Sequence, residues 1–510
     1  MQDNEAPLKS NYMSKKALII GTGLGALATA LRLTSRGYRV EMVEKHKRAG
    51  GRLNLLEKDG FTFDVGPSFF SMSYEFKELF DYCGVSNPLQ LEELNPVYAV
   101  HFANRQKPFL IYKDLDKLAR EFDGLETDFE QKIRRYIGTA KKLFHDTEDI
   151  VIRRNFNSKL DYLFQLTRVP VKHAPMMFRS MWKELDGIFT SEEAKVIFSL
   201  VAFFLGSTPF QTPAVYSLLN YTELEHDGYW NVRGGMYKIV EEMLKLLKQR
   251  GVVIHYNTEI RSVEAENGSV SAFIDSNGNR WTADLYVSNS DAAAFRGKVL
   301  NRPRFSEQRL DRMEWTLSPF TIYLGVKGKT ENLLHHNYFL GSNFKQYADT
   351  IFKTSVAPEK PYYYVNVSSK SNPASAPEGH ENIFILCPAP DLRYKPEWSD
   401  ADTLTENILT DLSKRTGFDF IGNRVSQTVM TPVEWQDTFN LYRGSGLGLA
   451  HGLNQVGGFR PSNKDEQYDN LYYVGASTTP GTGLPMVVIS SRLATERILK
   501  EHGPVHADVV

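Results

Sequence analysis

Two glycine-bearing segments lie at opposite ends of this chain, and each follows a short apolar stretch. Near the start, Lys15 to Ile20 leads into Gly21 to Ala26, with glycines at three alternating positions. Near the end, Asn470 to Val474 leads into Gly475, and a second glycine-rich turn follows from Pro480 to Pro485. A short apolar run that ends at glycine is typical of a buried parallel strand. We therefore expect both ends of the chain to build one dinucleotide-binding unit.

The first segment has the features of a complete nucleotide-binding turn. Its glycines let backbone N–H groups approach a pyrophosphate, and the predicted helix from about Gly25 to Arg36 directs its positive end at that charge. A second strand, Arg39 to Val43, ends at Glu44, about 20 residues after the first glycine, where a carboxylate suits a ribose 2′-hydroxyl. An acidic residue there disfavours NADP.

Two further turns favour FAD over NAD. Gly50-Gly51-Arg52 follows shortly after Glu44, and Asp64 to Ser68 follows a predicted hairpin that turns at Asp59-Gly60. We expect these turns to line an extended FAD, with Arg52 neutralising the phosphates and Gly66 close to the ribityl or flavin portion. The alternative is a glycine turn beside a solvated arginine.

Composition excludes several classes of protein. The chain has 510 residues and a net charge of −1, which suggests no nucleic-acid partner. Cys83 and Cys387 are too few for a disulfide framework, so we expect buried thiols in a reducing, cytoplasmic compartment. The apolar run Val196 to Leu205 is shorter than the ~20 residues that span a bilayer, and predicts a buried helix. The polar residues 1–12 are interpreted as a leader that precedes the fold.

The segment from Lys159 to Lys183 combines aromatic, aliphatic and basic residues. Such a composition is typical of helices that lie in a membrane interface, and also of amphipathic helices on a protein core. Pro170 and Pro175 interrupt any single long helix. Both interpretations stay open.

A second contribution to the nucleotide sheet is expected after Trp230. A helix with apolar residues at 3.6-residue spacing begins near Met236, and the strand Val252 to Tyr256 follows. After two hairpins, the strand Leu285 to Val287 would rejoin the sheet, and Ile260 would lie beside the adenine. The hairpin turns are predicted at Asn267-Gly268 and Asn277-Gly278.

Residues ~310–430 are expected to form mixed strands and helices. Phe320 to Val326 and Tyr362 to Val367 have strand-like alternation. The adjacent pair His335-His336 does not suit one metal ion, and we predict no metal site.

Several later segments resemble one known family in order and spacing. They are Leu205 to Phe210, Arg233 to Gly235, Ala376 to Gly379, Thr431 to Ser445, Phe459 to Pro461 and Asn470 to Pro485. With these motifs, the chain resembles the bacterial-type carotenoid (phytoene) desaturases of the FAD-dependent amine-oxidase-like superfamily. By general likeness it is similar to the hydroxycarotenoid 3,4-desaturases. The family's usual small residues are replaced here by Met486 to Val488.

The motifs and the resemblance together predict an α/β fold with a Rossmann-like FAD-binding domain, a mixed-sheet substrate domain and a helical, membrane-facing region. The FAD-binding domain would comprise residues 13–70, 221–300 and 441–510. The helical region would comprise residues 71–220 and the substrate domain residues 301–440.

The expected cofactor is FAD, and the candidate residues that bind it come from both ends and the middle of the chain. They are Gly21, Gly23, Leu24, Gly25, Ala26, Glu44, Lys45, Gly51, Arg52, Gly66, Pro67, Ser68, Ile260, Gly475, Ala476, Pro485, Met486 and Val487. No catalytic side chain is evident, because the chemistry belongs mostly to the flavin. Glu434 and His451 are the candidates for assisting it, and the helix that begins near Pro485 could stabilise charge on the reduced ring.

The resemblance implies hydride transfer from an allylic C–C bond of an acyclic carotenoid to flavin N5, with loss of a proton from the neighbouring carbon. A long apolar tunnel would hold the substrate and open at the inner face of the membrane, where oxygen or a quinone would reoxidise the flavin. The alternatives are a multistep phytoene-type desaturase, a flavin amine oxidase or protoporphyrinogen-oxidase-like enzyme, and a non-catalytic lipid-binding protein of the GDP-dissociation-inhibitor kind.

Overall fold

Both glycine segments extend from one five-stranded parallel sheet. The computed structural model describes residues 15–356 and 360–505, and the predicted leader lies outside this range. The strand order is β19-β13-β1-β2-β9, so the C-terminal strand joins the N-terminal ones as predicted. The strands are β1 (Lys16–Ile20), β2 (Arg39–Val43), β9 (Val253–His255), β13 (Leu285–Ser288) and β19 (Leu471–Tyr473).

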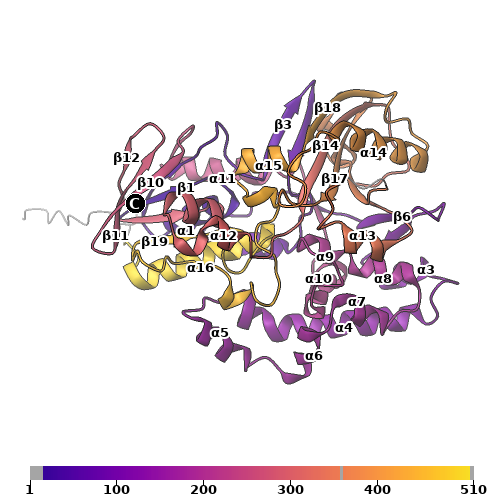
Figure 1. Cartoon of the computed structure of the whole chain (residues 1–510), viewed down its shortest axis with the longest axis horizontal. Helices are drawn as coiled ribbons and strands as arrows, with labels where there is room; N and C mark the ends of the chain where they lie inside the picture. The colour runs from indigo at the N-terminus through magenta and orange to yellow at the C-terminus, as the bar shows by residue number, and fades with distance from the viewer. Residues whose placement is uncertain (1–14, 357–359, 506–510) are drawn as a thin grey trace, which may run out of the picture.

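Three helices cover one face of this sheet. Helix α1 (Leu24–Thr34) packs against α16 (Leu484–His502) and α11 (Lys238–Gln249), and Figure 1 shows this unit on the left. Alanines at every second position of α1 are fully buried, which lets the helices approach closely. Helix α1 ends where Gly37 adopts a φ of 84°, as the sequence predicts.

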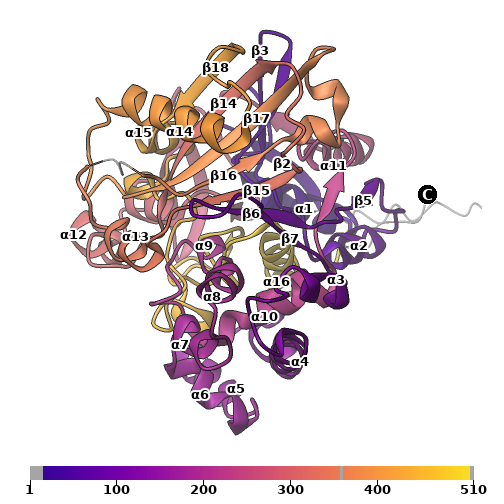
Figure 2. The same cartoon turned by 90° about the vertical axis from the view of Figure 1, so that its right-hand side faces the viewer.

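A second, seven-stranded sheet forms the other large layer. Its order is β18-β14-β17-β16-β15-β6-β7. The sheet is mixed: β6 runs parallel to β15, and every other pair of neighbouring strands in it is antiparallel. One face packs against α14, and the opposite face contacts the helical region (Figure 2). The elements are β6 (Tyr98–Phe102), β7 (Phe109–Ile111), β14 (Ser318–Lys327), β15 (His336–Leu340), β16 (Tyr363–Asn366), β17 (His380–Ala389), β18 (Arg424–Met430) and α14 (Ala401–Thr416).

A region of short helices covers the lower face of this sheet. The helices are α3 (Leu115–Arg120), α4 (Phe129–Thr147), α5 (Lys159–Leu166), α6 (Ala174–Phe178), α7 (Met181–Asp186), α8 (Glu192–Ser199), α9 (Val201–Phe204) and α10 (Leu218–Tyr221). The apolar run that starts at Val196 is divided between α8 and α9, whereas one helix was predicted. Val196, Ile197, Val201 and Ala202 are buried, as predicted. Among the described residues, no helix has the length and apolar character needed to cross a membrane.

Smaller elements connect these layers. The predicted hairpins are present: Asp59 and Gly60 turn β3 into β4, and Asn267 and Gly268 turn β10 into β11, each pair with positive φ. Both cysteines are buried, as expected. The remaining elements are β3 (Asn54–Lys58), β4 (Phe61–Val65), β5 (Leu91–Glu93), β8 (Trp230–Val232), β10 (Ile260–Glu266), β11 (Ser269–Asp275), β12 (Arg280–Trp281), α2 (Ser73–Tyr82), α12 (Glu307–Leu310), α13 (Phe344–Thr350) and α15 (Pro432–Phe439).

The β3–β4 hairpin packs closely against the large sheet at Gly325. A Cβ atom on Gly325 of β14 would lie 2.5 Å from the ring of the buried residue Phe61. We expect Gly325→Ala to destabilise the protein by about 1–3 kcal/mol, because the closely packed ring must shift. Thermal unfolding followed by circular dichroism measures the effect.

Gly138→Ala is the matched control. Gly138 lies within α4, and an added Cβ would meet no atom within 4 Å. Alanine at this position should therefore leave the midpoint of thermal unfolding unchanged or raise it. Equal midpoints for Gly325→Ala and the wild type would contradict the packing assigned to Phe61.

Candidate active site

The two ends of the chain meet at the carboxyl edge of the parallel sheet. A Cβ atom on Gly25 would lie 3.2 Å from the Cα atom of Gly475, so the two backbones are in close contact with little room for a side chain. Asn289, directly after β13, bridges the two segments: its Nδ2 donates to the Val474 carbonyl (3.0 Å), and its Oδ1 accepts from the Ala26 N–H (3.3 Å). A Cβ on Gly475 would lie 2.2 Å from the Asn289 Nδ2.

A large cavity of about 1240 Å³ opens at this edge. This exceeds the ~300–1,000 Å³ usual for one small ligand, so a cofactor and a second molecule could share it. Most residues predicted to bind FAD line it: Gly21, Gly23, Leu24, Gly25, Glu44, Lys45, Gly51, Arg52, Gly66, Pro67, Ser68, Ile260, Ala476, Pro485, Met486 and Val487. Ala26 and Gly475 are outside its lining and pack behind it. Contact of each residue with FAD stays a prediction.

Glu44 is oriented for a ligand hydroxyl. The Thr22 backbone N–H (2.9 Å) and hydroxyl (2.6 Å) donate to one carboxylate oxygen, and the His46 N–H donates to the other (3.0 Å). The side chain is 4% exposed and lines the cavity. A carboxylate held in this way is an acceptor with a fixed position, as recognition of a ribose requires.

A cation lies farther along the same wall. Burial lowers the pKa of Arg52 below its ordinary value, and the nearby Asp291 raises it. The guanidinium also donates to the Gly446 carbonyl (2.7 Å). Because an arginine stays protonated near neutral pH, Arg52 can supply positive charge to phosphates. With the left-handed turn at Gly51 (φ 60°) and the N-terminus of α1, the wall fits an extended dinucleotide.

The segment after β13 is the part of this wall that the sequence analysis missed. Asn289, Ser290 and Asp291 all line the cavity, and the Ser477 hydroxyl donates to Asp291 (3.1 Å). Burial raises the pKa of the Asp291 carboxyl. The sequence did contain a signal for these three residues, because they follow a buried parallel strand and ligands bind at the carboxyl ends of such strands.

Beyond the nucleotide segments the cavity becomes apolar. Aliphatic and aromatic side chains of the helical region face tyrosines of the large sheet across it. Of the lining carboxylates that the structure describes, Glu44, Glu259 and Asp291 all belong to the nucleotide segments. The apolar lining includes Leu143, Phe144, Val151, Leu166, Val169, Met177, Leu200, Phe203, Leu205 and Leu219.

The two candidate catalytic side chains have structural partners. Glu434 completes a capping box at the start of α15 by accepting from the Thr431 N–H (2.9 Å), and it is outside the cavity lining. His451 lines the cavity, but its Nε2 accepts from the Thr482 N–H (3.2 Å) and its Nδ1 lies 3.4 Å from the Leu205 carbonyl. Burial lowers its pKa to about 3, with a further contribution from Arg460. The geometry therefore favours a role for His451 in holding the Gly481–Gly483 turn.

Comparisons with known proteins agree with this site. Residues 27–499 match the family of flavin containing amine oxidoreductases. The chain is 32% identical to a zeta-carotene-forming phytoene desaturase of Myxococcus xanthus, covering 96% of this chain and 95% of that protein. It is 28% identical to a carotenoid 3,4-desaturase of Haloarcula japonica, covering 96% and 99%. The solved structure of cyclohexylamine oxidase from Brevibacterium oxydans is similar in fold, with a TM-score of 0.60, 14% identity and coverage of 96% and 99%.

These matches extend over both sheets and the helical region. The family carries a flavin, and the fit of the cavity wall to an extended dinucleotide makes FAD the cofactor of this chain. Because an amine oxidase has a similar fold, the fold alone does not identify the substrate. The apolar part of the cavity is the feature that bears on it.

The contact between the chain ends predicts a clear effect on cofactor binding. Gly475→Ala forces a Cβ against Asn289 at a φ of 101°, which separates β19 from the start of α1. We expect FAD affinity to fall about 10- to 100-fold, as a clash of 1–3 kcal/mol implies. Flavin retained after dialysis, measured by absorbance, tests this.

The control is Gly503→Ala. Gly503 also has a positive φ, but an added Cβ would meet no atom within 4 Å, so this variant carries the backbone strain without the collision. If both variants lose flavin equally, strain rather than the contact with Asn289 explains the loss.

Proposed function

The chain belongs to the bacterial-type carotenoid desaturases, within the flavin-containing amine oxidoreductase family, and we propose that it introduces C=C bonds into an acyclic carotenoid. Bound FAD supplies the two-electron acceptor for this oxidation. The named activities of the relatives support carotenoid desaturation as the reaction.

The apolar cavity is the observation that supports this proposal most directly. It continues from the cofactor segments into the helical region as a space lined by aliphatic and aromatic side chains. A hydrocarbon chain enters such a space favourably, whereas an ammonium group would lose its hydration without gaining a carboxylate partner there. The cavity therefore favours a polyene over an amine.

The chain's own residues would orient the substrate and stabilise charge. Leu200, Phe203 and Leu205 can hold a polyene against the cofactor segments while excluding water. Pro485 is in the first turn of α16, where the unpaired N–H groups give the helix a positive end that faces the cavity. This end would favour the reduced, more negative form of a flavin placed beside it.

We further propose that α5, the turn after it and α6 dock on a membrane. Their outward side chains are unusually exposed for apolar residues: Leu160 is 77%, Phe164 67%, Val171 85% and Phe178 87% exposed. These elements project from the lower edge of the molecule (Figures 1 and 2), and their inward residues line the cavity. A lipid-dissolved substrate could thus enter without crossing water.

The basic residues of this segment contribute less than its composition suggests. Lys172 pairs with Asp146 (2.8 Å), and Arg179 pairs with Glu184 (2.6 Å). The apolar side chains therefore carry the proposed docking. A peripheral position on the inner face of the membrane, with oxygen or a membrane quinone as electron acceptor, is consistent with it.

The finer proposal is 3,4-desaturation of a 1′-hydroxycarotenoid, supported by the likeness to a relative named for 3,4-desaturation. A multistep phytoene-type reaction is the competing assignment. We also propose that residues 13–70, 221–300 and 441–510 form the FAD-binding domain. The helical region would then span residues 71–220 and the substrate domain residues 301–440.

Anaerobic reduction of the bound flavin tests the reaction. An acyclic carotenoid should bleach the flavin and acquire an absorption maximum at longer wavelength, because each new double bond extends the conjugation. Monoamines and diamines should leave the flavin oxidised. Bleaching by an amine, with none by any acyclic carotenoid, would assign the chain to amine oxidation instead.

A charge in the apolar cavity should block turnover selectively. Phe203→Glu is expected to lower kcat/KM for the carotenoid by about 10-fold or more, since an unpaired carboxylate must lose its hydration when the substrate enters. Flavin content should be unchanged. Val425→Glu, at a position 49% exposed on β18, is the control and should retain wild-type activity.

Vesicle binding tests the docking surface. The triple variant Leu160→Ser, Phe164→Ser and Phe178→Ser should lower the partition coefficient on liposomes about 100-fold or more, because three apolar side chains no longer enter the lipid. Ile421→Ser and Val425→Ser, at exposed apolar positions away from α5 and α6, should bind as the wild type does. Co-sedimentation provides the measurement, and equal binding by both sets would rule the surface out.

A further inference from the structure

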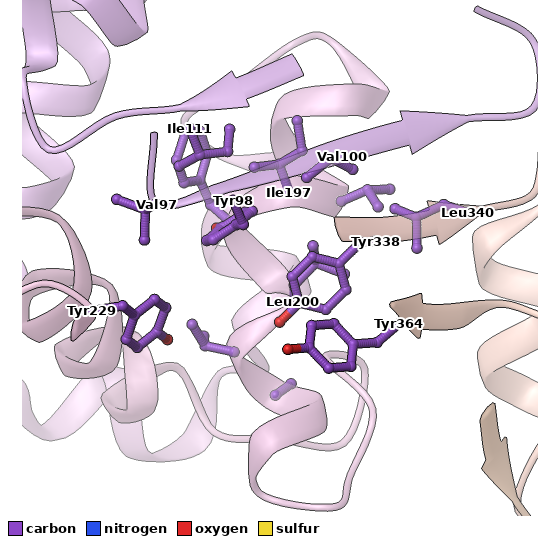
Figure 3. Packing of buried hydrophobic residues seen from close by; sticks show 14 of the residues in the cluster. Val97, Tyr98, Val100, Ile111, Ile197, Leu200, Tyr229, Tyr338, Leu340 and Tyr364 are labelled. Atoms are coloured by element: carbon purple, nitrogen blue, oxygen red, sulfur yellow. The ribbon is translucent and has the colours of Figure 1, made fainter. Parts of the chain in front are cut away.

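Three tyrosine hydroxyls meet in the apolar part of the cavity. Tyr229 precedes β8, Tyr338 lies on β15 and Tyr364 lies on the neighbouring strand β16; all three line the cavity. Figure 3 shows the phenolic ends of these side chains turned toward the same space. Apolar residues, among them Leu200 and Leu340, lie beside these hydroxyls. A polar centre of this kind fixes the orientation of a ligand in an otherwise apolar site.

The hydroxyls of Tyr338 and Tyr364 can still form hydrogen bonds with a ligand. The Tyr338 hydroxyl is buried and has no hydrogen-bond partner within residues 15–356 and 360–505. Tyr364 lies 2.6 Å from Nδ1 of His336, and the Asn366 amide donates to the same nitrogen (3.3 Å). That nitrogen is therefore an acceptor and the Tyr364 hydroxyl its donor. Ser68, at the cavity wall, and Asn366 also interact with this hydroxyl, so a ligand hydroxyl would donate to the Tyr364 oxygen in place of Ser68.

A buried carboxyl group lies behind the tyrosines. Glu223 belongs to the π-helical turn Thr222–His226, is 2% exposed and is outside the cavity lining. The Tyr98 and Tyr229 hydroxyls interact with this carboxyl, although neither of its oxygens has a partner of regular hydrogen-bond geometry in the described part of the chain. Burial raises its pKa to about 7.

This arrangement is costly without a ligand. A buried polar group that lacks a partner destabilises a fold, and here the Tyr338 hydroxyl lacks one among the described residues. Buried tyrosines normally satisfy their hydroxyls. Groups at a cavity wall that are left unsatisfied by the protein are candidates for contact with what the cavity binds.

We propose that Tyr229, Tyr338 and Tyr364 form a subsite for a hydroxyl group near one end of an acyclic polyene, and that Glu223 is the positioning residue that orients Tyr229. This rests on the proposed function. A hydroxyl can accept from Tyr338 and donate to the Tyr364 oxygen, whereas a carbonyl can only accept. A carboxylate or ammonium ligand would carry charge into a space whose lining offers no ion pair.

Two substrates of equal length, with and without a terminal hydroxyl, test the subsite. The wild type should favour the hydroxylated polyene in kcat/KM and in Kd, the latter read from the shift of polyene absorption on binding. Tyr338→Phe should lower kcat/KM for the hydroxylated polyene about 10-fold, through loss of one hydrogen bond, and leave the hydrocarbon unchanged. An equal effect on both substrates would overturn the subsite.

Glu223→Gln separates positioning from general stability. It should raise KM for the hydroxylated polyene while kcat, flavin content and turnover of the hydrocarbon stay unchanged; parallel losses on both substrates would make Glu223 merely structural. Tyr323→Phe is the matched control for Tyr338→Phe and should leave turnover of both substrates unchanged. Tyr323 is buried on the same sheet, its hydroxyl interacts with Thr321, and it is outside the cavity lining.

The outcomes also distinguish this subsite from the proposed reaction. If the wild type binds both polyenes equally and Tyr338→Phe changes neither Kd, the tyrosines hold only an ordered water and the subsite is excluded. If the wild type prefers the hydroxylated polyene in Kd but oxidises neither, the reaction fails while the subsite stands.

Discussion

The contact between Gly25, Gly475 and Asn289 is the constraint on which the rest of the structure depends. It brings the N-terminal phosphate turn and the C-terminal turn to the same sheet edge, although they lie at opposite ends of the chain. A side chain on Gly475 would collide with Asn289, and one on Gly25 would be tightly placed against Gly475. One cavity can then receive a cofactor along its whole length from segments that are remote in sequence.

The same constraint leaves the middle of the chain free to shape a substrate space. The large sheet and the short helices enclose the apolar part of the cavity between them, and the seven-stranded layer contributes its tyrosine-bearing face. The helices that line the cavity also present apolar side chains to the outside. In these proposals, the same helices would receive the substrate from the lipid and hold it beside the cofactor. The proposed docking and the proposed reaction therefore depend on one region of the protein.

Local sequence signals predicted the turns and strand ends whose conformation depends on the residue type at that position. Residues with positive φ follow a strand at Gly21 and form hairpin turns at Asp59-Gly60 and Asn267-Gly268, because Gly, Asn and Asp adopt this conformation at less cost than other residues do. The short buried strands β1 and β19 were predicted for the same reason. By contrast, Asn289 and Asp291 carry no local pattern of their own, and their roles depend on which strand lies beside which.

The sequence by itself determined the two nucleotide turns, the acidic residue after β2 and the presence of an apolar middle region, because these follow from glycine geometry and hydrophobic periodicity. Only the tertiary structure decided that His451 holds a turn and that Glu223 lies behind three tyrosines at a cavity wall. Burial and partners of a polar group depend on residues far away in sequence. The chemistry of a carboxyl or imidazole is therefore fixed only once the chain has folded.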